Sequence, residues 1–126
     1  MFTPLVDLRG IGDSYVANDG RDPLVTRDTI TKMAAAYLGT TSAADSQASP
    51  IFADYSGGFV PAILTTGTRD LLQSDSVRFY WKLHEAGAKV RLRVWEGMGH
   101  AFESVPGLPE GEQNMREVFG FLEKHL

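Results

Sequence analysis

Three residues of this chain have the types and the order needed for nucleophilic acyl transfer. Ser14 lies in the stretch GIGDSYVA, Asp70 in GTRDLL and His100 in GMGHAF. In a Ser–His–Asp triad the histidine takes the proton of the serine hydroxyl, while the carboxylate orients the imidazole and stabilises its charged form. Each role needs a particular local backbone conformation. The sequence around Asp70 and His100 is compatible with it, whereas the sequence around Ser14 is not.

Ser14 lacks the surroundings of a nucleophile. A nucleophilic serine on a sharp strand-to-helix turn needs glycine two positions to either side, because larger side chains clash there. Gly12 satisfies the first position, but the β-branched Val16 occupies the second, and the sequence after Ser14 predicts a loop. Ser56 also fails, because Asp54 precedes it by two positions and no strand leads into it. We therefore expect Ser14 to make a turn or capping hydrogen bond.

Asp70 and His100 each follow a predicted strand. Residues 61–67, PAILTTG, form a short apolar run closed by glycine, which is typical of a buried parallel strand. Residues 88–95, AKVRLRVW, alternate apolar and charged side chains, as a strand at a sheet edge does. The carboxyl ends of neighbouring parallel strands meet at one edge of the sheet, so the acid and the imidazole are expected to meet there. The alternative is a capping aspartate and a solvent-facing loop histidine.

The elements that position these two residues alternate along the chain. A Pro-containing apolar strand is predicted over residues 2–7, and helices over residues 26–39, 74–87 and 109–126. This order predicts one α/β domain over residues 1–126, with about three parallel strands flanked by three helices. The expected apolar faces are Val77, Tyr80, Trp81 and His84 on the second helix, and Met115, Val118, Phe119 and Leu122 on the third.

The run from Ser49 to Phe102 closely resembles the C-terminal part of the hormone-sensitive-lipase-like esterases of the α/β-hydrolase superfamily. The matching pieces are Ser49-Pro50, the G-x-x-D-x-L around Asp70, the L-x-x-A-G that begins at Leu83, and the GMxHxF around His100. The upstream stretch PLVDLRGIGDSY resembles the family's segment after the nucleophile region. The resemblance implies a partial α/β-hydrolase fold, with Asp70 as the triad acid and His100 as the triad base.

Two features of the chain depart from this family. The family often has His-Gly-Phe where this chain has His100-Ala101-Phe102, which restricts the turn without removing a catalytic group. The family's Gly-Asp-Ser-Ala-Gly-Gly nucleophile and His-Gly-Gly-Gly oxyanion segments do not occur in the sequence. The resemblance therefore places Ser14 downstream of the family's nucleophile.

Composition argues against several classes of partner and site. The net charge is −4, whereas nucleic-acid binding usually needs a basic face. Without cysteine the chain has no disulfide, thiolate metal site or thiol nucleophile. No phosphate-binding glycine loop or metal-spaced cluster is visible, so we expect neither a cofactor nor a metal. No apolar run reaches the length of a membrane span and no signal-peptide pattern occurs, so a cytoplasmic location is predicted.

Other residues that carry functional chemistry each have a structural alternative. Trp95 and Phe102 flank the histidine turn and are weak candidates for lining an acyl pocket, although aromatic residues at this spacing more often belong to the core. Asp75 is expected to cap a helix, with support of the Asp70 loop as the alternative. His84 and His125 are expected on a helix surface and at a helix end.

Two functions of different classes remain open. In the first, the chain is the C-terminal portion of a carboxylic ester hydrolase acting on a short-chain ester or acyl substrate, and it is inactive alone because the nucleophile and oxyanion donors are missing. In the second, it is a non-catalytic α/β module or truncated reading frame that serves only in binding or assembly. An unpaired apolar strand at residues 2–7 predicts association with a second copy or with a missing N-terminal half.

Overall fold

The computed structural model describes residues 1–125, and its elements alternate largely as the sequence predicts. The helix at residues 26–39 is confirmed together with its cap, because the Thr26 hydroxyl accepts a hydrogen bond from the amide of Thr29 at 3.2 Å. The elements in chain order are α1 (Ser14–Ala17), α2 (Arg27–Leu38), the 3-10 helix η1 (Pro50–Phe52), β1 (Ala62–Gly67), α3 (Gln73–Glu85), β2 (Val90–Trp95), the 3-10 helix η2 (Phe102–Ser104) and α4 (Pro109–His125).

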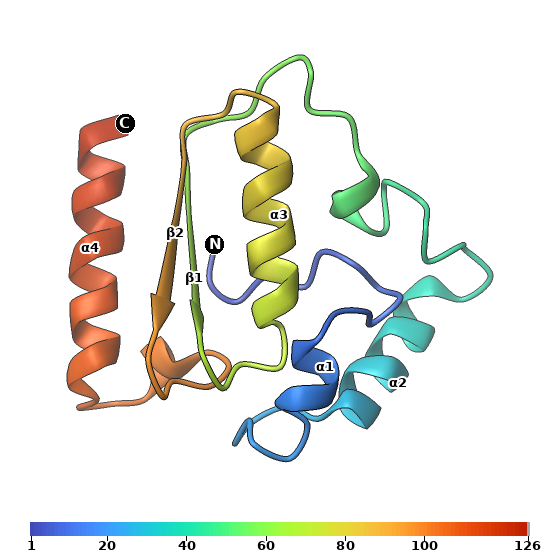
Figure 1. Cartoon of the computed structure of the whole chain (residues 1–126), viewed down its shortest axis with the longest axis horizontal. Helices are drawn as coiled ribbons and strands as arrows, with labels where there is room; N and C mark the ends of the chain where they lie inside the picture. Colours follow the sequence, from blue (N-terminus) through green and yellow to red (C-terminus); the bar gives the residue numbers. More distant parts are fainter. Residues whose placement is uncertain (126) are drawn as a thin grey trace.

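The two strands form a parallel ladder whose register runs from Ala62 opposite Val90 to Gly67 opposite Trp95. Every residue of β1 is buried, in keeping with its continuous apolar run. Both arrows in Figure 1 point to the lower end of the molecule, so the loops that follow them lie at the same end. The residues directly after each strand are therefore held at one edge of the sheet.

The prediction of a strand over residues 2–7 is wrong, because this segment pairs with the sheet at only one residue. Phe2 makes one parallel bridge to Thr65 of β1, so the described sheet has two strands and a bridge instead of about three strands. Pro4 follows the bridge closely and has no amide hydrogen to donate to a ladder. The segment then leaves the strand path.

Backbone donors in this segment bind side chains from elsewhere in the chain. The amides of Val6 and Asp7 donate to one carboxylate oxygen of Asp75, at 2.9 and 3.0 Å. The amide of Leu8 donates to the hydroxyl of Ser49 at 2.9 Å. These donors are no longer free for pairing with another strand, which weakens the basis for association through residues 2–7.

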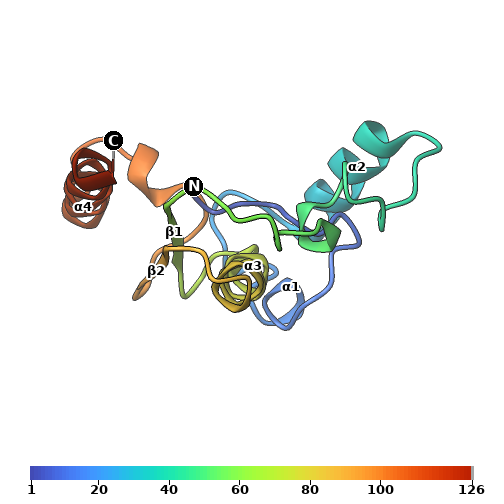
Figure 2. The ribbon, with the colours of Figure 1, turned by 90° about the horizontal axis from the view of Figure 1, so that it is seen from above.

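Helices cover both faces of the sheet, α3 on one and α4 on the other (Figure 2). Successive residues of β1 point to opposite faces, as the pleat requires. Leu64 packs with Val6, Phe79 and Leu83 on the α3 face. Ile63 packs with Val118 and Phe121 on the α4 face.

The side of α3 and of α4 that faces the core differs in part from the expected apolar face. In α3 the side chains that pack into the core are Phe79 and Leu83, while Trp81 remains 52% exposed and His84 is exposed. In α4 Val118 is buried as expected, but Phe119 is 55% exposed. In both helices the apolar side chains cover a broad sector of the surface, and contact with the sheet selects which part of that sector becomes core. The buried residues are Asp75, Ser76, Phe79 and Leu83 in α3, and Gly111, Asn114, Val118 and Phe121 in α4.

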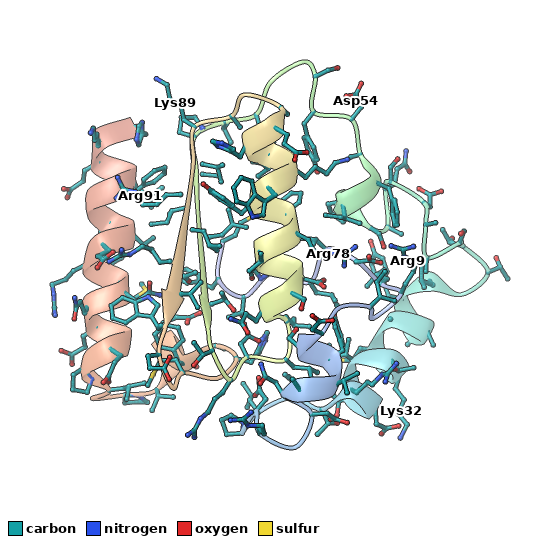
Figure 3. The ribbon with its side chains drawn as sticks, in the orientation of Figure 1. Arg9, Lys32, Asp54, Arg78, Lys89 and Arg91 are labelled. Atoms are coloured by element: carbon teal, nitrogen blue, oxygen red, sulfur yellow. The ribbon has the colours of Figure 1, made fainter. Side chains whose placement is uncertain are left out.

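The charged side of β2 lies against α4. Arg93 forms a hydrogen bond of 2.6 Å with Glu117 of α4, and the Arg91 guanidinium lies 5.7 Å from the ring centre of Phe121. Figure 3 shows Arg91 on this side of the strand. The alternation along β2 is thus as predicted for the arginines, which remain exposed beside α4, whereas Val94 is 45% exposed. None of the helices within residues 1–125 is long and apolar enough to cross a bilayer.

Candidate active site

The carboxylate of Asp70 is buried and held by neighbours from its own strand end. Asp70 lies three residues after β1 and is 0% exposed. Its Oδ2 accepts a hydrogen bond of 2.6 Å from the Thr66 hydroxyl, and its Oδ1 accepts one of 2.9 Å from the amide of Leu72. Buried carboxylates need such partners to remain satisfied, and these two also fix the direction of the group.

The imidazole of His100 lies against this carboxylate. Its Nδ1 is 3.2 Å from Asp70 Oδ1, and the His100 side chain is 19% exposed. Burial by itself lowers the pKa of His100, but the hydrogen bond and charge of Asp70, with the charges of Asp22 and Glu103, raise the pKa above its ordinary value. The structure therefore brings the acid and the imidazole together, as the strand-end argument predicts. Their catalytic roles remain predictions.

The loops after β1 and β2 pack so closely that position 67 requires glycine. A Cβ on Gly67 would lie 1.9 Å from the carbonyl oxygen of Met98, so no larger residue fits without a shift of the backbone. The same carbonyl accepts a hydrogen bond of 2.9 Å from the amide of Arg69, and the amide of Gly97 donates to the Thr68 hydroxyl at 2.8 Å. The two loops thus form one rigid support for Asp70 and His100.

The residue after the histidine has an unusual backbone conformation. Ala101 adopts φ 52° and ψ 31°, in the left-handed region that favours glycine. This is the position at which the resembling family often has glycine. Alanine therefore carries a local conformational cost in this turn.

Ser14 lies inside the protein and its hydroxyl is already bonded on both sides. Its Oγ donates to the carbonyl of Leu71 at 2.7 Å and accepts from the amide of Ser74 at 3.0 Å, and Ser14 is only 4% exposed. The expected loop is instead the start of the short helix α1. The expected capping role is confirmed, because Ser74 lies in the first turn of α3.

The two aromatic candidates for an acyl pocket contact α4 or lie in the core. The indole nitrogen of Trp95 donates to the amide oxygen of Asn114 at 3.0 Å. Phe102 is 4% exposed, and its ring centre lies 6.0 Å from that of Trp95. These contacts favour the packing alternative for both residues, and a contact with substrate remains a prediction.

The remaining candidates have structural contacts. Asp75 binds the backbone near the N-terminus, so neither capping of its own helix nor support of the Asp70 loop describes it. His84 is exposed and stacks on Tyr80 with ring centres 5.7 Å apart. His125 packs on Phe121 at 4.5 Å. Across residues 1–125, no group of three or more His, Cys, Asp or Glu side chains is arranged to hold a metal ion.

Sequence reasoning missed three polar residues that support the site. Thr66 binds the Asp70 carboxylate, Asn18 donates through its side chain to the carbonyl of Asp70 at 2.9 Å, and Asp22 accepts from the amide of His100 at 3.1 Å. Asn18 and Asp22 lie in a stretch rich in Gly, Asn, Asp and Pro that indicates only a loop. No local pattern in that stretch points to partners about 50 and 78 positions away.

Comparison with known proteins agrees with the α/β fold. A family model described as alpha/beta hydrolase fold matches residues 1–104. An esterase from Acinetobacter venetianus is 27% identical over 123 residues, which cover 96% of this chain and 40% of the relative. The chain therefore spans well under half the length of the curated relative that it matches.

Solved esterase structures are similar over almost the whole chain. Esterase E25 superposes with a TM-score of 0.90 at 40% identity, over 98% of this chain and 38% of that one. An esterase from the bacterial hormone-sensitive lipase (HSL) family superposes with a TM-score of 0.93 at 31% identity, over 98% of this chain and 42% of that one. The chain belongs to the α/β-hydrolase family, within the group of hormone-sensitive-lipase-like esterases.

Proposed function

We propose that this chain supplies the acid and the base of a carboxylic ester hydrolase to a nucleophilic serine outside residues 1–126. The observation that carries the proposal is the 3.2 Å contact between Asp70 Oδ1 and His100 Nδ1 at the carboxyl ends of β1 and β2. Structural ion pairs also show this geometry. Here, however, the pair lies at the sheet edge where parallel α/β proteins build their sites.

The arrangement of the pair suits general base catalysis. Because Nδ1 of His100 faces Asp70, Nε2 is the ring nitrogen left to take the proton of a serine hydroxyl and later return it to a leaving alcohol. The Asp70 carboxylate, held by Thr66 and Leu72, keeps the imidazole in one orientation. The raised pKa of His100 favours the imidazolium that forms when the serine attacks the ester.

The chain by itself is proposed to be inactive. Ser14 is the one serine in a Gly-Asp-Ser sequence. Its hydroxyl already donates a hydrogen bond to the carbonyl of Leu71 and accepts one from the amide of Ser74. With Ser14 engaged in this way, we propose that the chain presents no serine hydroxyl for the pair to activate, so that hydrolysis through an acyl-enzyme does not proceed. In the complete enzyme we propose a short-chain ester as the substrate.

Complementation tests this proposal. The chain is mixed with a polypeptide comprising the portion of esterase E25 that it does not match, and hydrolysis of p-nitrophenyl butyrate is measured. We expect turnover in the mixture and none with either polypeptide alone. His100→Ala and Asp70→Asn should abolish or strongly reduce it. The matched control Ser14→Ala should retain it, once circular dichroism shows that this variant is folded.

Two results would contradict the proposal in different ways. Turnover by the chain alone that disappears in Ser14→Ala would identify Ser14 as the nucleophile. Association of the two polypeptides without hydrolysis would favour the second candidate, a module that acts only in assembly. That candidate has some support from exposed apolar side chains such as Met33, Tyr37 and Val60, which are 58%, 71% and 71% exposed. Sedimentation velocity of the chain alone tests the proposed self-association.

A further inference from the structure

Asp22 is a buried carboxylate whose two oxygens each bind two backbone amides. The residue is 6% exposed and lies between α1 and α2. Its four hydrogen bonds come from Leu24 at 2.9 Å and Val25 at 3.2 Å to Oδ1, and from Leu71 at 2.8 Å and His100 at 3.1 Å to Oδ2.

One oxygen of this carboxylate joins the two loops that carry the acid and the base. Leu71 directly follows Asp70, and the other donor is the amide of His100 itself. A shared acceptor limits the distance between these two backbone positions, which lie on different loops and have no covalent constraint near them. The separation of the Asp70 carboxylate from the His100 ring depends on that distance, because both side chains extend from the joined segments.

The segment around Asp22 also packs tightly against both loops. A Cβ on Gly99, the residue before His100, would lie 2.5 Å from Cδ of Pro23. On the other loop, the side-chain amide of Asn18 donates to the carbonyls of Asp70 at 2.9 Å and Thr68 at 3.2 Å. These contacts are independent of the carboxylate and place the same short segment between the two loops.

We propose that Asp22 is a positioning residue for the Asp70–His100 pair. It acts through the backbone amides of Leu71 and His100 and is not proposed to touch substrate. A carboxylate suits this task because both of its oxygens accept hydrogen bonds, whereas an asparagine has one acceptor oxygen and turns an NH₂ group toward the other pair of amides. The link to ester hydrolysis rests on the proposed function, but the positioning itself is a property of this chain.

The first test is a pH titration of His100 in the isolated chain, monitored by NMR. The charged groups that face its ring are Asp70, Asp22 and Glu103. In Asp22→Asn we expect a lower pKa for His100 and loss of the low-field resonance of the hydrogen-bonded Nδ1 proton. The matched control is Asp54→Asn, which removes an exposed carboxylate that accepts the amide of Ser56. It should leave both signals unchanged.

A charge-conserving variant separates positioning from a simple charge effect. Asp22→Glu keeps the negative charge but moves the oxygens by one methylene group. We expect it to lose the low-field Nδ1 proton as Asp22→Asn does. Wild-type behaviour of His100 in Asp22→Glu would overturn the proposal, because Asp22 would then act by charge alone.

A measurement on the unsubstituted protein keeps the test independent of folding of the variants. Scalar couplings across hydrogen bonds, from the amide nitrogens of Leu71 and His100 to the carboxyl carbon of Asp22, report the shared oxygen directly. Both couplings are expected, and the absence of either overturns the proposal.

Complementation with the unmatched portion of esterase E25 measures the effect of Asp22 on ester hydrolysis. Asp22→Asn should lower kcat for p-nitrophenyl butyrate by about 10- to 100-fold with little change in KM, the scale expected for misplaced catalytic groups. An unchanged kcat in the folded variant would contradict the proposal. If the unsubstituted mixture is inactive, the proposed function fails, while the NMR measurements still decide the role of Asp22.

Discussion

Substitution of Asp75 by asparagine should stabilise the protein above pH 6. Asp75 is 0% exposed, and its Oδ2 accepts the amides of Val6 and Asp7 while its Oδ1 has no hydrogen-bond partner. Burial raises the pKa of Asp75 to about 6, although the two amides and the nearby Arg78 act in the opposite direction. Arg78 binds Asp7 more closely, at 2.7 Å, and Figure 3 shows it beside Arg9, the second partner of Asp7. Asp75 is therefore incompletely compensated as an anion.

The magnitude follows from the difference between the folded and unfolded pKa values. Because the folded pKa is the higher one, the folded state binds the extra proton between pH 4 and 6, and stability falls as pH rises through that interval. A shift from 3.8 to about 6 corresponds to about 3 kcal/mol at pH 7.5. In Asp75→Asn the amide oxygen still accepts the amides of Val6 and Asp7, while the ionisation is removed. The variant should match the native protein near pH 4 and exceed its stability by up to about 3 kcal/mol at pH 7.5.

Urea unfolding at several pH values between 4 and 8 measures this difference. Other titrating groups contribute equally to both proteins, so the difference between the two curves isolates Asp75. Asp13→Asn is the control, because Asp13 is exposed and makes no capping hydrogen bond. A difference that stays constant with pH, or a variant that is less stable at pH 7.5, would refute the reasoning.

Three further substitutions test the region around the acid and the base. Gly67→Ala forces its new methyl group against the carbonyl of Met98. We expect the free energy of unfolding in urea to fall by about 3 kcal/mol or more, and the low-field His100 ring proton to disappear from the NMR spectrum. A fully stable variant would show that the loops separate easily. Ala101→Gly relieves a left-handed conformation and should stabilise the protein by about 0.5 to 1 kcal/mol in thermal unfolding, whereas destabilisation would contradict the assigned backbone angles. Asp70→Asn removes the main group that raises the pKa of His100, so that pKa should fall in an NMR titration and an unchanged value would exclude the contact.

Local pattern was sufficient for the two paired strands, the three long helices and the pair of site residues. The apolar run of β1 and the alternation in β2 each identify a strand, and parallel pairing brings the residues after them to one edge. Asp70 and His100 could therefore be predicted to meet without knowledge of any other contact. The end signals of α2 are equally local, because Thr26 bonds an amide only three residues away.

Tertiary structure alone decided which side of each helix is buried and which polar groups support the site. Periodicity gives the spacing of apolar residues, but where they cover a broad sector it does not give the part that meets the sheet. Phe79 and not Trp81 therefore enters the core. Asp75 and Asp22 bind amides up to 69 and 78 positions away. Such partners leave no trace in a local window, since a buried carboxylate is satisfied by whichever donors the folded chain brings to it.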